Sequence, residues 1–413
     1  MIDPFQVLLL FSVTLVLSYF SSLIYTKIKI PDLVWLLGIG FLLGPTLGVI
    51  QKDIFVAASQ VMGIVALNIV TFGAGIETDI DALKEVLTKS ATLATMTFIV
   101  IVLGIGILVK VYSPFPLSVW EGVLFGTMIA GVSTVSVLSV IDEMKKLMPK
   151  MDNTRLILAL ESTIVDPIRI VVAITIIKMI QFSNLAPLTS IRDIYATFTL
   201  ATVLGVIFGI IWVILLNRLR GRRYNYMLTI SVLFLLYFLM ETLTGQGGGA
   251  IATFAFGIVL ANYQFFAKRL NMNLRVDKSS IIQFNNEISF FVKSYYFVYM
   301  GLIATVSREY IVIGIVLTAL VIVLRALVGT VVGKLLNFTK RELVISRLMF
   351  PLGTSALVVS QIPLIYDPEG IIFKHPEMYT NMLIPVILGT VLFSALISPK
   401  IAQRQLEDEE STK

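Results

Sequence analysis

The chain has 413 residues, of which 57% are hydrophobic and only 14% are charged, and its mean hydropathy is +0.92. This composition excludes a soluble protein of this length and predicts a polytopic membrane protein. The net charge of +6 comes from basic residues without interleaved aromatic residues on a folded domain, so no nucleic-acid partner is expected. The absence of cysteine excludes disulfides, thiolate metal sites and thiol catalysis.

A membrane-spanning helix needs about 20 mostly apolar residues. The sequence contains thirteen runs of this kind, at residues 5–25, 32–50, 54–76, 90–111, 118–141, 154–180, 193–216, 224–243, 249–266, 283–303, 309–333, 342–365 and 379–398. The connections between the runs are too short for a soluble domain, and the first run has no basic segment before it, which argues against a cleaved signal peptide. The predicted fold is an all-α polytopic membrane domain over residues 1–413, with a short cytoplasmic tail at 399–413.

Lys and Arg residues are divided unevenly between the two sides of the predicted domain. Alternate connections place 22 of the 32 basic residues on one side and only 6 on the other. Because cytoplasmic loops are enriched in Lys and Arg, the side with 22 is predicted to be cytoplasmic. The N-terminus is then outside, the C-terminus is inside, and the expected location is the cell (plasma) membrane, within the lipid bilayer.

The centre of the fifth run, 118–141, is rich in small and hydroxyl residues, among them Gly131, Ser133 and Thr134. Glycine weakens a helix through its conformational entropy, and hydroxyls compete for backbone hydrogen bonds. A break is therefore expected here, and the carbonyls that it frees are natural cation ligands. The alternative is close packing between helices through small residues.

The sixth run, 154–180, carries Glu161, Asp166 and Arg169 together with Pro167. A charge at the centre of a membrane costs about 2.5–3.5 kcal/mol, so an ion or proton pathway is the default explanation. Glu161 and Asp166 are about 140° apart around a helix and do not form a carboxylate pair, whereas Asp166 and Arg169 can touch. The alternative is a buried ion pair that serves only assembly.

Oxygen atoms are predicted to gather around Asp166. Pro167 cannot donate a hydrogen bond to the carbonyl of Thr163, so that oxygen is free one turn before Asp166. The carboxylate, this carbonyl and the hydroxyls of Ser162 and Thr163 make a hard-oxygen set that suits sodium or lithium. If a sodium ion and a proton compete for Asp166, binding one expels the other, and exchange follows once the site can face either side.

The twelfth run, 342–365, contains Pro351 and Gly353 near its centre and is expected to be interrupted. Two interrupted spans, one in each half of a chain, indicate an inverted-repeat transporter with its site at the membrane midplane. Buried charges of opposite sign are expected to pair, so Arg325 in the eleventh run should neutralise at least one acid.

At these residues the chain resembles the cation/proton antiporter superfamily, in particular the NhaP-type sodium/proton exchangers of archaea and bacteria. Residues 161–166, Glu-Ser-Thr-Ile-Val-Asp, resemble the family motif Glu-Ser-x-x-Asn-Asp. The resemblance implies that Asp166 binds the ion and accepts the proton, and that Arg325 pairs with Glu161. Some positions depart from the family pattern, and two of these departures concern the predicted site. Val165 stands where the family has Asn or Asp, and residues 132–134, Val-Ser-Thr, are closer to the potassium-efflux branch.

The residue patterns and the resemblance together predict one site. Its ion- and proton-binding residues are predicted to be Asp166, Ser133, Thr134, Glu161 and Ser162, with Asp166 as the sodium ligand and Arg325 as the ion-pair partner. No cofactor is expected. The roles of three other intramembrane cations, Arg169, Lys293 and Arg347, are left open.

The resemblance also implies an architecture and an activity. The expected protein is a homodimer in which spans 1–3 and 8–10 form the dimer side and spans 4–6 and 11–13 form the ion-translocating core, with two broken helices crossing near Asp166. It is expected to exchange Na+ or Li+ for H+ by alternating access, for pH and sodium homeostasis, and not to be an enzyme. Electroneutral exchange is expected because Arg325 leaves one carboxylate free to titrate. The alternatives are a K+/H+ antiporter of the potassium-efflux branch and a sodium-coupled solute symporter of similar topology.

Overall fold

The computed structural model of the chain describes most of the sequence. The described residues are 12–21, 23, 31–48, 52–78, 87–112, 116–133, 136–138, 140–141, 144, 151–181, 187–222, 224–269, 274–305, 307–367 and 369–410. Within these ranges the regular secondary structure is entirely helical, and each of the thirteen predicted apolar runs contains helical residues. The predicted all-α fold is therefore confirmed.

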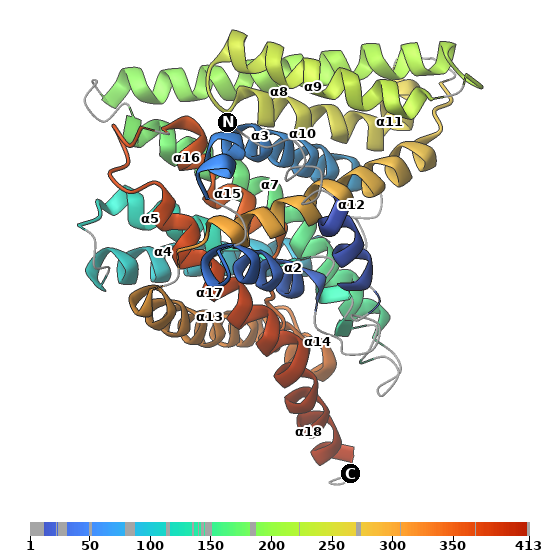
Figure 1. The fold of residues 1–413 in the computed structure, drawn as a ribbon. Coiled ribbons are helices and arrows are strands. Elements are labelled where there is room, and N and C mark those ends of the chain that lie inside the picture. The colour runs from blue at the N-terminus through green and yellow to red at the C-terminus, as the bar shows by residue number, and fades with distance from the viewer. Residues whose placement is uncertain are drawn as a thin grey trace. The chain divides into compact units, whose positions relative to one another are not determined.

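Figure 1 shows the helices and their labels. They are α2 (Asp32–Phe41), the π-helical turn η1 (Leu42–Thr46), α3 (Lys52–Glu77), α4 (Leu87–Tyr112), α5 (Val119–Ile129), α7 (Asp152–Gln181), α8 (Pro187–Arg218), α9 (Asn225–Thr244), α10 (Gly248–Ala261), α11 (Tyr263–Arg269), α12 (Lys278–Ile303), α13 (Arg308–Leu335), α14 (Lys340–Leu348), α15 (Thr354–Ser360), α16 (Ile362–Tyr366), α17 (Glu377–Leu392), the π-helical turn η3 (Phe393–Ile397) and α18 (Ser398–Glu410).

Several helices are long and apolar enough to cross a membrane. By length and composition, five described helices qualify: Leu87–Tyr112, Tyr195–Arg218, Asn225–Thr244, Arg308–Leu335 and Glu377–Glu407. A sixth qualifies if α10 and α11 are one span, although they are bent by 74° where the sequence predicts one continuous run. The count of thirteen spans stays a prediction, because breaks divide other runs into shorter helices.

The fifth and twelfth runs are interrupted, as the sequence predicts. α5 ends at Ile129, and residues 130–133 are not helical. Between α14 and α15, residues 349–353 are also not helical. Pro351 has no N–H to continue a helix, and Gly353 is extended, with φ −144° and ψ −158°. Both interruptions therefore fall where residue chemistry disfavours a helix.

The chain divides into two compact units. The first consists of Met1–Gly63, Val86–Arg169 and Lys293–Lys413, and the second of Ile64–Glu85 and Ile170–Val292. The predicted division into a dimer side and an ion-translocating core stays a prediction.

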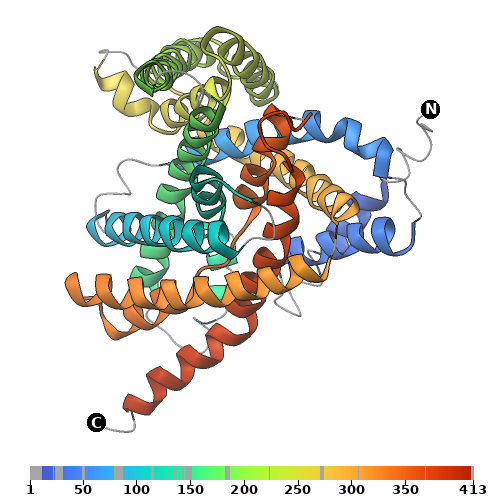
Figure 2. The same cartoon turned by 90° about the vertical axis from the view of Figure 1, so that its left-hand side faces the viewer.

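In the first unit, α13 packs against α4, α14 and α17 (Figure 2). A buried apolar cluster lies beside both interruptions and includes Leu93, Val132, Ile157, Val328 and Ile345.

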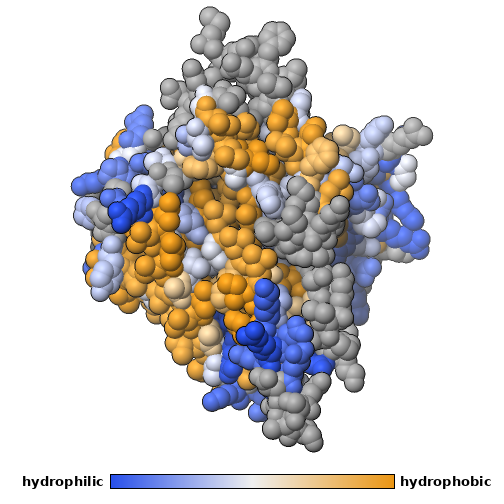
Figure 3. Space-filling model, turned by 60° about the horizontal axis from the view of Figure 1, so that its bottom comes forward, coloured by the Kyte–Doolittle hydropathy of each residue, from blue (hydrophilic) through white to orange (hydrophobic). Residues whose placement is uncertain are grey.

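The outer side of α4 shows that apolar side chains also face away from this core. Leu93, Ile101 and Ile105 are buried, whereas Ile99, Leu103 and Ile107, at a spacing of four residues, are exposed. Figure 3 shows a broad apolar surface on one face, which is typical of contact with lipid.

In the second unit, α10 packs against α8 and α9, and also meets α11. Glu241 at the end of α9 fixes the start of α10, because its two carboxylate oxygens accept the N–H groups of Gly247 and Gly249 at 2.9 Å. Glu241 thus satisfies backbone donors that would otherwise be orphaned at a helix N-terminus. In a separate contact, Trp212 on α8 donates its indole N–H to Thr229 Oγ1 on α9 at 3.1 Å.

The predicted tail at 399–413 is helical in its described part. α17 continues through η3 into α18, which extends to Glu410 (Figure 1). Ser398 Oγ donates a hydrogen bond to the carbonyl of Leu348 at 2.8 Å, close to the point where α14 ends. The C-terminal segment therefore helps to satisfy the backbone at the interruption of the twelfth run.

We predict that Gly257→Ala lowers the free energy of unfolding by about 1–3 kcal/mol, which is the usual effect of overpacking a core. A Cβ at this position of α10 would lie 2.7 Å from the carbonyl oxygen of Phe72 and 2.9 Å from the backbone nitrogen of Ile76 on α3. Thermal unfolding of the purified protein in detergent measures the effect. Gly38→Ala is the matched control, since nothing lies within 4 Å of its added Cβ. Equal unfolding temperatures for the two variants would contradict this packing.

Candidate functional site

The two interrupted runs touch each other. The backbone N–H of Ser133 donates to the carbonyl of Pro351 at 2.7 Å. A Cβ on Gly353 would lie 2.6 Å from both Cβ and Oγ of Ser133, so this close approach requires glycine. The hydroxyl of Ser133 in turn accepts the N–H of Ser136 at 3.4 Å, and residues 136–138 are helical. Non-helical backbone is therefore packed against non-helical backbone, as a membrane environment requires.

Asp166 on α7 is the acid beside this crossing. Its Oδ1 accepts a hydrogen bond from Ser355 Oγ at 2.8 Å, and the Nη2 atom of Arg169 lies 3.5 Å from the same oxygen. Lys293 on α12 also interacts electrostatically with Asp166. The Asp166 side chain is 19% exposed, whereas that of Arg169 is fully buried. A small ion can therefore approach the Asp166 carboxylate. The position of the carboxylate is fixed by Ser355 and Arg169.

The predicted hydroxyl ligands make hydrogen bonds to backbone groups where the structure describes them. Ser162 Oγ donates to the carbonyl of Val132 at 2.6 Å and so joins α7 to the break in the fifth run. Thr163 Oγ1 donates to the carbonyl of Ala159 at 2.9 Å, within its own helix. Ser133 is at the crossing, and Thr134 lies outside the described residues. The structure therefore shows these hydroxyls satisfying backbone groups, and their part in ion binding stays a prediction.

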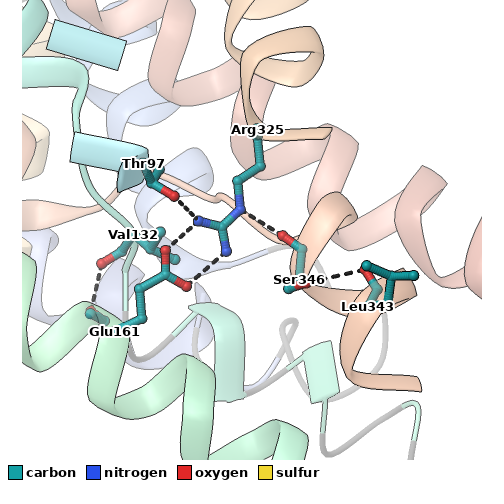
Figure 4. A network of polar contacts seen from close by, with 7 residues as sticks. Thr97, Val132, Glu161, Arg325, Leu343 and Ser346 are labelled. Atoms are coloured by element: carbon teal, nitrogen blue, oxygen red, sulfur yellow. Dashed lines mark hydrogen bonds and ion pairs between the residues drawn. The ribbon is translucent and has the colours of Figure 1, made fainter. Parts of the chain in front are cut away.

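Glu161 and Arg325 form a buried ion pair, shown in Figure 4. The Nη1 atom of Arg325 contacts Glu161 Oε1, and Nη2 donates to Oε2 at 2.7 Å, so the pair is bidentate. Arg325 also donates to Thr97 Oγ1 at 2.9 Å and to the carbonyl of Ser346 at 2.6 Å. Both charged side chains are fully buried. The contact that the sequence led us to expect is present, and it engages both oxygens of Glu161.

The sequence does not single out Ser355, although it is the second residue of α15 and follows the predicted interruption. The spacing of three predicts that Arg169 can touch Asp166, as it does, but assigns Arg169 no role. Both make hydrogen bonds to residues far apart in the sequence, which a single sequence does not reveal.

The oxygen atoms at the crossing suit a small monovalent cation. Among the described residues there is no group of three or more His, Cys, Asp and Glu side chains that could hold a metal ion. The available donors are one carboxylate, hydroxyls and the carbonyls of unwound backbone. Hard oxygen donors with a single negative charge match sodium or lithium, and the carboxylate among them also accepts a proton.

Comparisons with known proteins identify a family that matches nearly the whole chain and two relatives that match 70% of it. Residues 12–404 match the model of the family described as "Sodium/hydrogen exchanger, transmembrane". Na(+)/H(+) antiporter 1 of Methanocaldococcus jannaschii is 26% identical over 293 residues, which are 70% of this chain and 66% of that protein. Probable Na(+)/H(+) antiporter 2 of the same organism is 25% identical over 307 residues, 70% of this chain and 69% of that protein. The match thus spans just under two-thirds of the first relative and slightly more of the second.

Solved structures are similar to this fold. The structure of the sodium proton antiporter MjNhaP1 from Methanocaldococcus jannaschii at pH 8 gives a TM-score of 0.79 at 22% sequence identity, and the similarity covers 97% of this chain and 100% of that chain. An electron-microscopy structure of MjNhaP1 gives 0.75 at 21% identity, with 98% and 99% covered. The interrupted helices described above therefore belong to a fold that is also found in a solved antiporter.

We predict that Arg325→Met lowers the free energy of unfolding by about 3–5 kcal/mol, because it leaves the buried carboxylate of Glu161 without its partner. Adding Glu161→Gln should recover part of this loss, which a double-mutant cycle of unfolding in detergent measures. The exposed pair of His375 and Glu377 provides the control, and His375→Gln should change stability by less than about 0.5 kcal/mol. Additive losses for the two core substitutions would argue against the pair.

Proposed function

Because this chain belongs to the transmembrane sodium/hydrogen exchanger family, we propose that it is a secondary antiporter that exchanges sodium ions for protons at Asp166. The observation that carries the proposal is a partly exposed carboxylate beside the contact of two interrupted helices. Such a contact supplies both a titratable anion and unwound backbone at one point, which is the arrangement expected of an ion site in a membrane transporter.

Exchange follows from competition for one carboxylate. Oδ1 of Asp166 is held by Ser355 and faces Arg169, and no described residue donates a hydrogen bond to Oδ2. A proton or a sodium ion bound at Asp166 neutralises the same charge, so each expels the other. Alternating exposure of this site to the two sides of the membrane then couples the movement of one ion to that of the other. Ser133, Thr134 and Ser162 are the proposed additional ion ligands at the crossing.

An electroneutral stoichiometry is proposed from the state of Glu161. Both of its carboxylate oxygens are engaged by Arg325, and the pair is completely buried. Glu161 is therefore held as a structural anion, and Asp166 is left as the carboxylate that changes its proton. With one exchanging carboxylate, one sodium ion moves for each proton.

The proposed protein is a homodimer of the cell membrane, with its N-terminus outside and its C-terminus in the cytoplasm. The uneven distribution of Lys and Arg supports this orientation. The dimer and its division into a dimer side and a core are supported by the resemblance of the chain to NhaP-type exchangers. In such a protein, one group of helices carries the ion site across the membrane relative to the other.

A K+/H+ antiporter is the second candidate function. The residues that favour it are Val132-Ser133-Thr134 at the break in the fifth run, which resemble the potassium-efflux branch. Potassium is larger than sodium, so a site with few fixed charges could accept it. Flux measured with sodium, lithium and potassium in turn separates the two candidates, and a sodium-coupled symporter would show no proton movement.

We predict that Asp166→Asn abolishes sodium-dependent proton flux in proteoliposomes, because asparagine carries no exchangeable proton and no charge. Glu287→Gln is the matched control, since it neutralises an exposed acid on α12 that contacts Gln283. This control should retain exchange close to that of the unchanged protein. Near-normal exchange by Asp166→Asn would overturn the assignment of the site.

We also predict that a membrane potential imposed across the proteoliposomes leaves the rate of sodium/proton exchange unchanged. One positive charge leaves for each that enters, so the potential does no net work on the cycle. The measurement compares initial proton flux with and without a potassium diffusion potential of either sign. Acceleration at one sign and slowing at the other would show that charge moves and would contradict the one-to-one stoichiometry.

A further inference from the structure

Arg169 is a fully buried cation at the centre of the site. Its Nε atom donates to the carbonyl of Ala130 at 3.2 Å, and its Nη1 atom donates to Ser355 Oγ at 3.0 Å. Its Nη2 atom lies 3.5 Å from Asp166 Oδ1. Ala130 is the first residue of the break in the fifth run, and Ser355 follows the break in the twelfth. One guanidinium group therefore connects both interruptions to the proposed ion-binding carboxylate.

The break in the fifth run is shaped around this guanidinium. A Cβ on Gly131 would overlap Nη2 of Arg169 and would also crowd its Cζ and Nε atoms. Only glycine leaves the space that the arginine occupies. Gly131 therefore has two effects. It weakens the helix, as the sequence predicts, and it leaves room for the Arg169 side chain.

The hydrogen bonds around Ser355 have a fixed direction. A guanidinium can only donate, and a serine hydroxyl has one proton and two lone pairs. Because Ser355 Oγ accepts from Arg169, its single proton is available for Asp166 Oδ1, at 2.8 Å. Arg169 therefore orients the hydroxyl that holds Asp166, in addition to facing the carboxylate itself.

The positive charge of the buried Arg169 must also be balanced. Arginine is always protonated in proteins, so a fully buried guanidinium needs an anion nearby. Within the described residues Nη2 has no hydrogen-bond partner, and Asp166 is the acid that it faces. Val165, on the same side of α7, is buried and apolar and cannot supply a hydrogen bond between the two breaks.

We propose that Arg169 is a positioning residue that fastens both interrupted runs to Asp166 and competes with sodium for its carboxylate. When Asp166 is ionised and empty, Arg169 neutralises it. When sodium binds, two cations share one carboxylate, so the arginine weakens sodium binding. This inference rests on the proposed function, because it assigns the determinant of ion affinity at the same site.

The test compares Arg169→Gln with Arg169→Lys in proteoliposomes at alkaline pH, where protons compete least with sodium. Arg169→Gln removes the charge and should lower the half-saturating sodium concentration about tenfold, while turnover falls because the crossing is less firmly held. Arg169→Lys keeps the charge without the planar fork, so its half-saturating sodium concentration should stay within about twofold of that of the unchanged protein, but its turnover should fall.

Arg347→Gln is the control, because it removes another intramembrane arginine and should not change the half-saturating sodium concentration. An unchanged or higher value for a folded Arg169→Gln overturns the proposal.

A second measurement covers the case in which Arg169→Gln does not fold. Thermal unfolding in detergent is measured for Arg169→Gln, Asp166→Asn and the double variant. The double variant should be more stable than the sum of the single losses indicates, and should fold even where Arg169→Gln does not, because neither member of the Arg169–Asp166 pair is left without its partner. Additive losses, or a double variant that also fails to fold, would overturn the proposal. This cycle requires no transport, so it decides the pairing of Arg169 even if the protein exchanges no sodium.

Discussion

The rest of the structure depends on one constraint, which is that backbone freed from a helix inside a membrane must find hydrogen-bond partners within the protein. Two helices are interrupted, and the buried carbonyls that the breaks free accept hydrogen bonds from specific groups. Ala130 accepts from Arg169, Val132 from Ser162, and Pro351 from the backbone of Ser133. These contacts turn two locally unfavourable segments into one fixed crossing.

α7 is the element that meets this constraint and also carries Asp166, the proposed exchanging group. By helical geometry, Ser162, Asp166 and Arg169 lie within an arc of about 60° on one side of the helix. This side therefore satisfies the break, offers the carboxylate and supplies the cation that faces it. Glu161 lies outside this arc and is used differently, as the buried partner of Arg325 on α13. One helix thus carries both a buried ion pair and the carboxylate that is proposed to exchange its counter-ion.

Local chemistry made part of this arrangement predictable from the sequence. Glycine, hydroxyl residues and proline weaken a helix wherever they occur, so the interruptions near Gly131 and Pro351 followed from residue type alone. The cost of buried charge similarly predicted that Arg325 neutralises an acid, and the resemblance to NhaP-type exchangers implied that this acid is Glu161. The contact of Arg169 with Asp166 was predictable from their spacing, but its bonds to Ala130 and Ser355 were not, because these residues approach it only through the packing of three separate helices. For the same reason, the bend between α10 and α11 and the helical C-terminal segment were not foreseen.

If sodium and a proton occupy Asp166 in turn, sodium binding must release protons, and counting these protons tests the competition without any flux. Calorimetric titration of the purified protein with sodium chloride, repeated in buffers with different ionisation enthalpies, gives their number. At a pH where Asp166 is protonated, we expect the release of about one proton per sodium ion, since each ligand excludes the other. Sodium binding without proton release would contradict this competition.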